Sequence, residues 1–294
     1  MSRKSKGPSS EAAVSIAIAG IALRFTLPEP LVRVIGQRYA NFITAATPRF
    51  SLSGSCTPPL LPFASPASSS APVVITRENI ALIRRADFHL ELNLRSGRGR
   101  MTVSRNIYSF DTLLRVLLSA ILGKRGGFLI HGAGLVIDRK GYAFAGISGS
   151  GKSTLTRLRG KHEALSDEIL AVTRAGKGYA VHGTPFWGEL KSRGRNTRAR
   201  LSRFFFLEKG DLFRTRKLKS DEAIKRLLQC ALVFEKSPAQ SEEALASAEA
   251  LVKQLRPEVL VFPKSKRLPA FLAELAAGSG PGKPRDGIPG CKGN

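Results

Sequence analysis

The sequence predicts an α/β fold with a smaller α+β region at its N-terminus. Strand-like and helical segments follow one another along most of the chain, and one strand runs into a glycine-rich loop that precedes a helix. Hydrophobic residues make up 43% and charged residues 23% of the 294 residues, which is the usage of a packed globular protein. That length suffices for one large domain or two ordinary ones. The chain can therefore bury the core that an enzyme needs.

The chain is strongly basic. It carries 47 Lys and Arg against 22 Asp and Glu, a formal net charge of +25 at pH 7. Such a balance indicates a partner among nucleic acids, anionic lipids and phosphorylated ligands, and composition alone does not choose between them. Cys56, Cys230 and Cys291 form no CxxC pair, so the sequence predicts neither a disulfide framework nor a zinc site. We expect a reducing, cytoplasmic location.

The N-terminus imitates a signal peptide only loosely. Residues 1–7 are basic and residues 12–23 are apolar, but Glu11 interrupts the junction and no clear small-residue cleavage site follows. No stretch approaches the roughly 18 to 20 apolar residues that span a bilayer. We therefore expect neither export nor a membrane span.

An accessory α+β domain is expected over residues 12–122, after a flexible N-terminus of residues 1–11. Residues 54–72 are rich in Pro and Ser and predict a loop, and the four strand-like segments after it suggest a small antiparallel sheet. The apolar face of residues 109–122 predicts a buried helix that Gly123 ends. The expected strands are residues 14–25 (one or two strands), 50–53, 73–76, 80–83, 88–94 and 100–104, with a further helix over residues 31–44.

The main domain is expected over residues 123–277. Its first three apolar runs are separated by Gly132-Ala133-Gly134 and by Asp138-Arg139-Lys140-Gly141, and the second break is typical of a hairpin turn. Residues 278–294 are rich in Gly and Pro without apolar periodicity, which predicts a disordered tail. The expected strands are residues 128–131, 135–137, 142–145, 169–173, 179–182, 204–207 and 259–262, and the expected helices are residues 220–234, 241–255 and 269–277.

The strongest motif is the glycine-rich loop at residues 146–153. It matches the pattern G-x-x-x-x-G-K-[ST] in full, and strand, loop and helix follow in the required order. Backbone N–H groups and the helix N-terminus can then surround phosphate oxygens. Lys152 would contact the β- and γ-phosphates, and the Ser153 hydroxyl would ligate Mg²⁺. The motif predicts ATP and Mg²⁺ as cofactors, bound by Gly146, Ile147, Ser148, Gly149, Ser150, Gly151, Lys152, Ser153 and Thr154.

Two adjacent carboxylates, Asp167 and Glu168, lie 15 and 16 residues after Lys152. One can hold Mg²⁺ through water while the other accepts a proton from an attacking hydroxyl, the two tasks of phosphoryl transfer. Alternatively, Ser166 caps a helix whose first turn holds both acids. The strand-like character of the residues that follow favours the first interpretation. His131 ends an apolar run, where a lone His is more often structural than catalytic.

Two further segments have competing interpretations. Residues 182–189 place Trp187 and Glu189 in a segment bounded by Gly and Pro, either as a loop that closes over nucleotide or substrate or as a buried Trp anchor. Residues 191–219 have a net charge of +9, which suits a solvated face, a site for an acidic peptide or phosphate, or a nucleic-acid surface. No nucleic-acid-binding motif is evident, so the last is not expected. The basic residues are Lys191, Arg193, Arg195, Arg198, Arg200, Arg203, Lys209, Arg214, Arg216, Lys217 and Lys219.

These motifs together resemble a known family. The catalytic domain of HPr kinase/phosphorylase is similar, and the HPr-kinase-related proteins (kinase A type) of bacterial peptide-modification gene clusters are more so. The resemblance implies a mixed β-sheet P-loop kinase of the phosphoenolpyruvate carboxykinase/HPr kinase type with a small α+β N-terminal domain. It also implies ATP- and Mg²⁺-dependent phosphorylation of a Ser hydroxyl on a protein or peptide. The matching segments are residues 106–115, 127–136, 146–153, 165–168, 182–189 and 205–210.

The resemblance also assigns site residues. It implies an active-site role for His131, phosphate binding by Lys152 and Mg²⁺ binding by Ser153. The catalytic base would be the second of the two acids, but Glu168 stands where the family has Asp, so Asp167 and Glu168 both remain candidates. The predicted catalytic residues are His131, Lys152, Asp167 and Glu168, and the predicted metal ligands are Ser153, Asp167 and Glu189.

One motif of the bifunctional enzymes is missing. Their Leu-Glu-Ile-Arg-Gly segment, which supplies a metal-binding Glu, has only Ala180-Val181-His182-Gly183 as its counterpart, so we expect neither phosphorylase activity nor HPr as substrate. Glu189 is the hypothetical replacement for that Glu. Three functions follow in order: a serine kinase acting on an acidic protein or peptide, a non-catalytic ATP-binding switch or scaffold, and a basic nucleic-acid-binding ATPase. The sequence leaves open whether the protein is a homo-oligomer.

Overall fold

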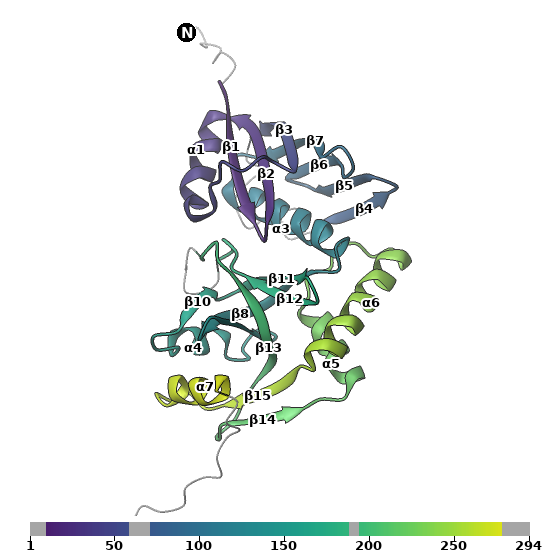
Figure 1. The fold of residues 1–294 in the computed structure, drawn as a ribbon. Coiled ribbons are helices and arrows are strands. Elements are labelled where there is room, and N and C mark those ends of the chain that lie inside the picture. Colours follow the sequence, from purple (N-terminus) through teal and green to yellow (C-terminus); the bar gives the residue numbers. More distant parts are fainter. Residues whose placement is uncertain (1–9, 59–70, 188–193, 278–294) are drawn as a thin grey trace, which may run out of the picture.

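The computed structural model describes residues 10–58, 71–187 and 194–277, which form two mixed sheets with helices packed against them (Figure 1). Residues 1–9, most of the predicted loop 54–72 and the predicted tail 278–294 lie outside the described residues. The prediction of a mixed α/β protein is confirmed. Among the described residues, no helix is long and apolar enough to cross a bilayer.

The first sheet has seven strands in the order β1-β2-β3-β7-β6-β5-β4. The predicted small antiparallel sheet is confirmed in the four strands from β4 to β7. β3 pairs in parallel with both β2 and β7 and joins that sheet to the first hairpin. β3 also extends through Gly54, where the loop was predicted to begin, because the absent side chain lets the Met101 carbonyl approach. The strands are β1 (Glu11–Ile18), β2 (Ile21–Pro28), β3 (Phe50–Thr57), β4 (Val73–Arg77), β5 (Ile80–Arg85), β6 (Phe88–Asn93) and β7 (Arg98–Ser104).

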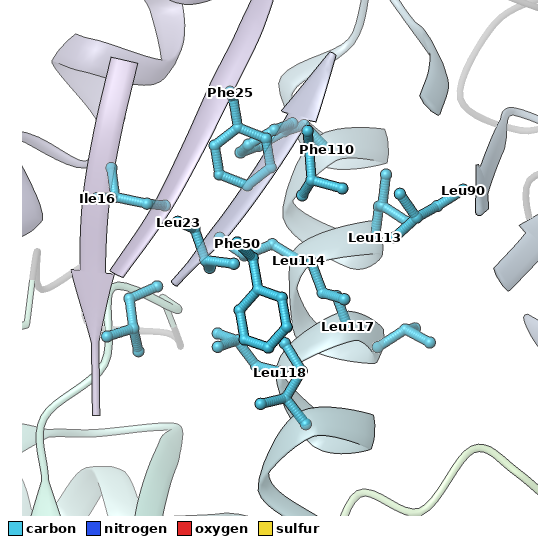
Figure 2. Close-up of a cluster of buried hydrophobic side chains, with 14 of the residues drawn as sticks. Ile16, Leu23, Phe25, Phe50, Leu90, Phe110, Leu113, Leu114, Leu117 and Leu118 are labelled. Atoms are coloured by element: carbon cyan, nitrogen blue, oxygen red, sulfur yellow. The ribbon is translucent and has the colours of Figure 1, made fainter. Parts of the chain in front are cut away.

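One face of this sheet is covered by two helices. The predicted helix over residues 31–44 is shorter, with α1 at Glu29–Arg38 and a 3-10 turn, η1, at Ala40–Phe42. The predicted buried helix is confirmed as α3 (Ile107–Gly123), and the Asn106 side chain caps it by accepting a hydrogen bond from the Tyr108 N–H. Figure 2 shows how α3 fills the core, with Phe110, Leu113, Leu114, Leu117 and Leu118 facing Ile16, Leu23, Phe25, Phe50 and Leu90.

The second sheet holds the glycine-rich loop. Its strand order is β10-β8-β11-β12-β13-β15-β14, and β9 pairs with both β8 and β13. The pairs of β13 with β9 and β15 are parallel and the others antiparallel, so this sheet is mixed as well. Its strands are β8 (Phe128–Ile137), β9 (Lys140–Ala145), β10 (Glu163–Ser166), β11 (Ile169–Ala175), β12 (Gly178–His182), β13 (Arg198–Lys209), β14 (Arg214–Lys217) and β15 (Glu258–Phe262).

Several boundaries differ from the prediction. β8 is one strand and not two, because the small residues between the apolar runs stay in the ladder: a Cβ at Gly134 would lie 2.6 Å from the Leu170 side chain. The predicted hairpin turn is confirmed, and Asp138 and Arg139 both have positive φ. β14 was not predicted, because its four residues contain no hydrophobic side chain. The helices are α4 (Lys152–Arg157), α5 (Ser220–Cys230), α6 (Pro238–Leu255) and α7 (Leu268–Ala276).

The core of the first sheet continues into the second. The buried cluster around α3 includes Leu129 on β8, Ile169 and Ala171 on β11, and Phe186. α3 therefore packs on both sheets and lies between them (Figure 1).

Candidate phosphate-binding site

The glycine-rich loop connects the end of β9 with the first residue of α4. Gly149 and Gly151 adopt φ values of 80° and 109°, which residues with a side chain rarely adopt. A Cβ at Gly151 would also lie 2.9 Å from the Phe262 ring. The predicted order of strand, loop and helix is thus observed, with the loop fixed by backbone geometry that glycine alone accommodates at Gly151.

Lys152 folds back over this loop. Its side chain is largely buried, and Nζ donates hydrogen bonds to the carbonyl oxygens of Gly146 (2.9 Å) and Ile147 (3.0 Å). Carbonyl oxygens are weaker partners for an ammonium group than phosphate oxygens. An anion in the loop could therefore draw the ammonium away from them.

His131 lies between the loop and the acidic pair because of sheet register. On one side of β8, the Gly146 N–H donates to the His131 carbonyl (3.3 Å). On the other side, Ile169 pairs with His131, and the Gly132 N–H donates to the Glu168 carbonyl (3.0 Å). The His131 Nδ1 atom lies 3.6 Å from Glu168 Oε1. Gly146 and Glu168, which are far apart in sequence, thus bond to β8 from opposite sides.

The pKa of the Glu168 carboxyl is lowered by its neighbours. The His131 imidazole is the main cause that lowers the pKa of the Glu168 carboxyl, and the positive charges of Lys152 and Arg115 act in the same direction against partial burial. The carboxylate is consequently ionised at neutral pH and accepts hydrogen bonds. Three of the predicted catalytic residues, His131, Lys152 and Glu168, interact electrostatically at one place.

Asp167 is nearly fully buried in the turn between β10 and β11. The alternative in which Ser166 caps a helix is wrong, because β10 ends at Ser166 and β11 begins two residues after Asp167. The predicted ligands suit Mg²⁺, since a hydroxyl at Ser153 and a carboxylate at Asp167 are hard oxygen donors that can share the ion with phosphate oxygens. Within the described residues, no group of three His, Cys, Asp or Glu could hold a metal alone. Glu189 lies outside them.

The Trp187 segment is anchored from both sheets. Thr184 Oγ1 donates a 2.6 Å hydrogen bond to the Ile169 carbonyl. The Arg38 guanidinium, at the end of α1, lies 3.5 Å from the centroid of the Trp187 ring and donates to the Pro185 carbonyl (3.3 Å). Such cation–π stacking fixes the indole, which favours the anchor interpretation of this segment.

Asp111 organises the same region from α3. It accepts hydrogen bonds from the Tyr39 hydroxyl (2.5 Å) and from Arg115 Nη2 (2.8 Å), and Arg38 Nη2 lies 3.5 Å away. Arg115 in turn contributes charge at Glu168. Neither Asp111 nor Arg115 was predicted to have a role. The signal was present, since they are the only charged residues of α3 and stand four positions apart on one helix face.

The basic segment 191–219 does not form one patch. Arg203 pairs with Glu258, Arg216 lies 3.6 Å from both Glu208 and Glu222, and both arginines belong to the second sheet. Lys191 and Arg193 lie outside the described residues. Part of the charge is thus neutralised within the fold, which weakens the interpretation of the segment as a single binding surface.

The fold and site define a mixed α/β protein whose second sheet presents a glycine-rich loop to a His–Glu pair. A family model described as SynChlorMet cassette protein ScmC matches residues 104–272, more than half of the chain, so this chain belongs to that family. The solved structure of the Hpr(Ser) kinase/phosphatase from Coxiella burnetii shares 13% identity over 51% of this chain and 94% of that chain. The TM-score of that match is 0.26. No curated protein matches.

Proposed function

We propose that this protein is an ATP- and Mg²⁺-dependent kinase that phosphorylates a Ser hydroxyl of a protein or peptide connected with its cassette. The observation that carries the proposal is the approach of His131 to Glu168 at 3.6 Å, beside a glycine-rich loop over which Lys152 folds back. A structural turn would need neither an ammonium group held over the loop nor a carboxylate kept ionised next to it.

Each group has a task in phosphoryl transfer. The backbone N–H groups of residues 148–153 bind the phosphates, and Lys152 exchanges its two carbonyl partners for phosphate oxygens. Glu168, held by His131, orients the acceptor hydroxyl. The hydroxyl oxygen bonds to the γ-phosphorus as the bond to the β-phosphate oxygen breaks, and the hydroxyl proton passes to the Glu168 carboxylate late in the transfer. When bound at Ser153 and Asp167, Mg²⁺ neutralises charge on the transferring phosphate.

The lowered pKa of Glu168 bears on the choice of base. A carboxylate with a low pKa is a weak proton acceptor, and the loose transition state of phosphoryl transfer asks mainly for orientation of the hydroxyl. We therefore assign Glu168 to hydroxyl orientation and Asp167 to the metal. Glu168→Gln should lower kcat with little change in ATP affinity, whereas Asp167→Asn should weaken the Mg²⁺ dependence. The opposite pattern would exchange the two roles.

Nucleotide binding is tested first. Titration of the chain with Mg-ATP by calorimetry should give saturable binding that Lys152→Ala abolishes. Lys140→Ala, at the exposed β8–β9 turn, removes the same charge as a matched control and should leave the affinity unchanged. An equal loss of affinity in both variants would mean that ATP binding depends on net charge and not on the glycine-rich loop.

Transfer is tested next with γ-labelled ATP and the peptides and proteins encoded in the same cassette. Label should appear on Ser of one of them and depend on Glu168. Normal ATP binding without any transfer would defeat the kinase proposal and favour the ATP-binding switch or scaffold. ATP turnover stimulated by DNA, with DNA affinity that falls steeply with salt, would favour the nucleic-acid-binding ATPase instead.

A further inference from the structure

The first sheet has one covered face and one open face. α1 and α3 both pack on the face that carries Leu23, Phe25 and Phe50, as Figure 2 shows for α3. The alternate residues of the same strands point the other way and are exposed or half-buried. No described helix packs on this second face. An open sheet face of seven strands is a large surface that the proposed kinase chemistry does not use.

Sheet register aligns arginine and hydroxyl side chains on this open face. In one row across the strands, Arg24 pairs with Ser51, and Ser51 with Arg98. In the next row, Ser53 pairs with Arg100, and Arg100 with Glu91. Neighbouring strands lie about 4.8 Å apart, so Arg24 and Arg98 are about 10 Å apart, and Arg100 follows Arg98 by about 7 Å on the same face.

These rows surround a hollow of about 710 Å³. Its hydroxyl groups come from Thr26, Ser51 and Ser53, and its charged side chains are those of Arg98, Arg100 and Glu91. Hydroxyls donate and accept hydrogen bonds, and guanidinium groups bind carboxylates with two parallel hydrogen bonds. The lining therefore suits a ligand with carboxylates and backbone amides.

The positive charge on this face is only partly offset by the fold, through Glu91 opposite Arg100. Among the described residues, no ion pair joins Arg24, Arg98 or Arg100 to a carboxylate, whereas Arg85 on the same sheet pairs with Asp87 at 2.6 Å. Arg98 and Arg100 lie two positions apart on the same face of one strand, so their like charges repel each other. An anionic partner would reduce that repulsion.

We propose that the open face of the first sheet docks an acidic peptide segment of a partner, with its carboxylates on Arg24, Arg98 and Arg100. A nucleic acid fits less well, because the phenylalanines of these strands lie on the covered face and leave no phenyl ring for base stacking. α3 separates this face from the glycine-rich loop. Docking therefore leaves the candidate phosphate site free and does not depend on its activity.

Binding is measured on the full chain by fluorescence anisotropy with a fluorescein-labelled decaglutamate peptide, without nucleotide. The wild type should bind saturably, more weakly as salt rises. Arg24→Gln/Arg98→Gln/Arg100→Gln should weaken binding about tenfold, the sum expected for three exposed ionic contacts. Because all three side chains are exposed, the thermal unfolding midpoint should stay near that of the wild type.

The matched control removes the same charge elsewhere. Arg214→Gln/Lys217→Gln/Lys219→Gln changes three exposed residues of the second sheet and its flank and should leave the affinity within about twofold. An equal loss of peptide affinity in the two triple variants would overturn the proposal, because binding would then depend on net charge and not on the open face. A single-stranded oligonucleotide of equal charge serves as competitor. If it displaces the labelled peptide at a lower concentration than unlabelled peptide does, the proposal is overturned and the face binds nucleic acid.

Hydrogen exchange locates the contact independently of any variant. The peptide should protect backbone amides of β2, β3 and β7. Protection confined to residues 198–219 would overturn the proposal and assign the peptide to the second sheet. Since neither readout involves ATP, failure of the kinase proposal and failure of this one are separate results.

Discussion

Replacing Asp111 by Ala should destabilise the protein and release Trp187 at the same time. The Asp111 side chain is 8% exposed and faces Arg38 and Arg115, whose side chains are 11% and 27% exposed. Without the carboxylate, two guanidinium groups face each other, and the fully buried Tyr39 hydroxyl loses its acceptor. The same change frees Arg38, which lies against the Trp187 ring.

The expected loss of unfolding free energy follows from how deeply each ion pair is buried. Removing one partner of a buried charge pair costs about 3 to 5 kcal/mol, and partial hydration of Arg115 places Asp111→Ala near 3 kcal/mol. Tyr39→Phe keeps both arginines paired and removes one hydrogen bond, so it should cost about 1 kcal/mol. Lys124→Ala breaks the exposed pair with Glu243 and should cost less than about 1 kcal/mol.

Urea unfolding followed by circular dichroism gives these free energies. Trp187 is the only tryptophan of the chain, so its emission reports the loss of the Arg38 contact directly. We expect the emission of Asp111→Ala to differ from that of the wild type in the folded state, and that of Lys124→Ala to be the same. A loss of unfolding free energy in Asp111→Ala no larger than that in Lys124→Ala would contradict a buried charge cluster at Asp111.

Three further predictions concern the loop and two titratable groups. Gly151→Ala should weaken Mg-ATP binding in calorimetry more than Gly149→Ala, because only at Gly151 does a Cβ also meet the Phe262 ring. Burial lowers the pKa of His182 to about 4, so the unfolded chain binds more protons below pH 6.5. Stability in urea should then fall by up to about 1.4 kcal/mol per pH unit on acidification, and less in His182→Asn; a slope unchanged in that variant would contradict this. Because the pKa of Glu168 is lowered, its ionised form stabilises the fold above the ordinary value of 4.5, and this contribution is lost as the pH falls through the lowered value. The free energy of unfolding of Glu168→Gln should therefore differ from that of the wild type at neutral pH, and the two values should converge in acid.

Features whose signals are local could be predicted from the sequence. The hairpin at Asp138 and Arg139, the buried helix α3 and the order of strand, loop and helix at the glycine-rich loop were all predicted and observed. Turn chemistry, apolar periodicity and positive φ at glycine act over a few residues, so a short window of sequence contains them. The roles of His131, Lys152, Asp167 and Glu168 stay predictions.

Contacts between segments that are distant in sequence depend on the tertiary structure. β3 joins two hairpins into one sheet through parallel pairs, although its Gly and Ser resemble a loop. His131 meets Glu168 because β8 and β11 pair in one register, and Arg38 meets Trp187 across the two sheets. The fold also determines how the net charge of +25 is distributed. Some arginines are neutralised in ion pairs, and others lie on the open face of the first sheet. Register and packing depend on the burial of whole surfaces, which no local window of sequence encodes.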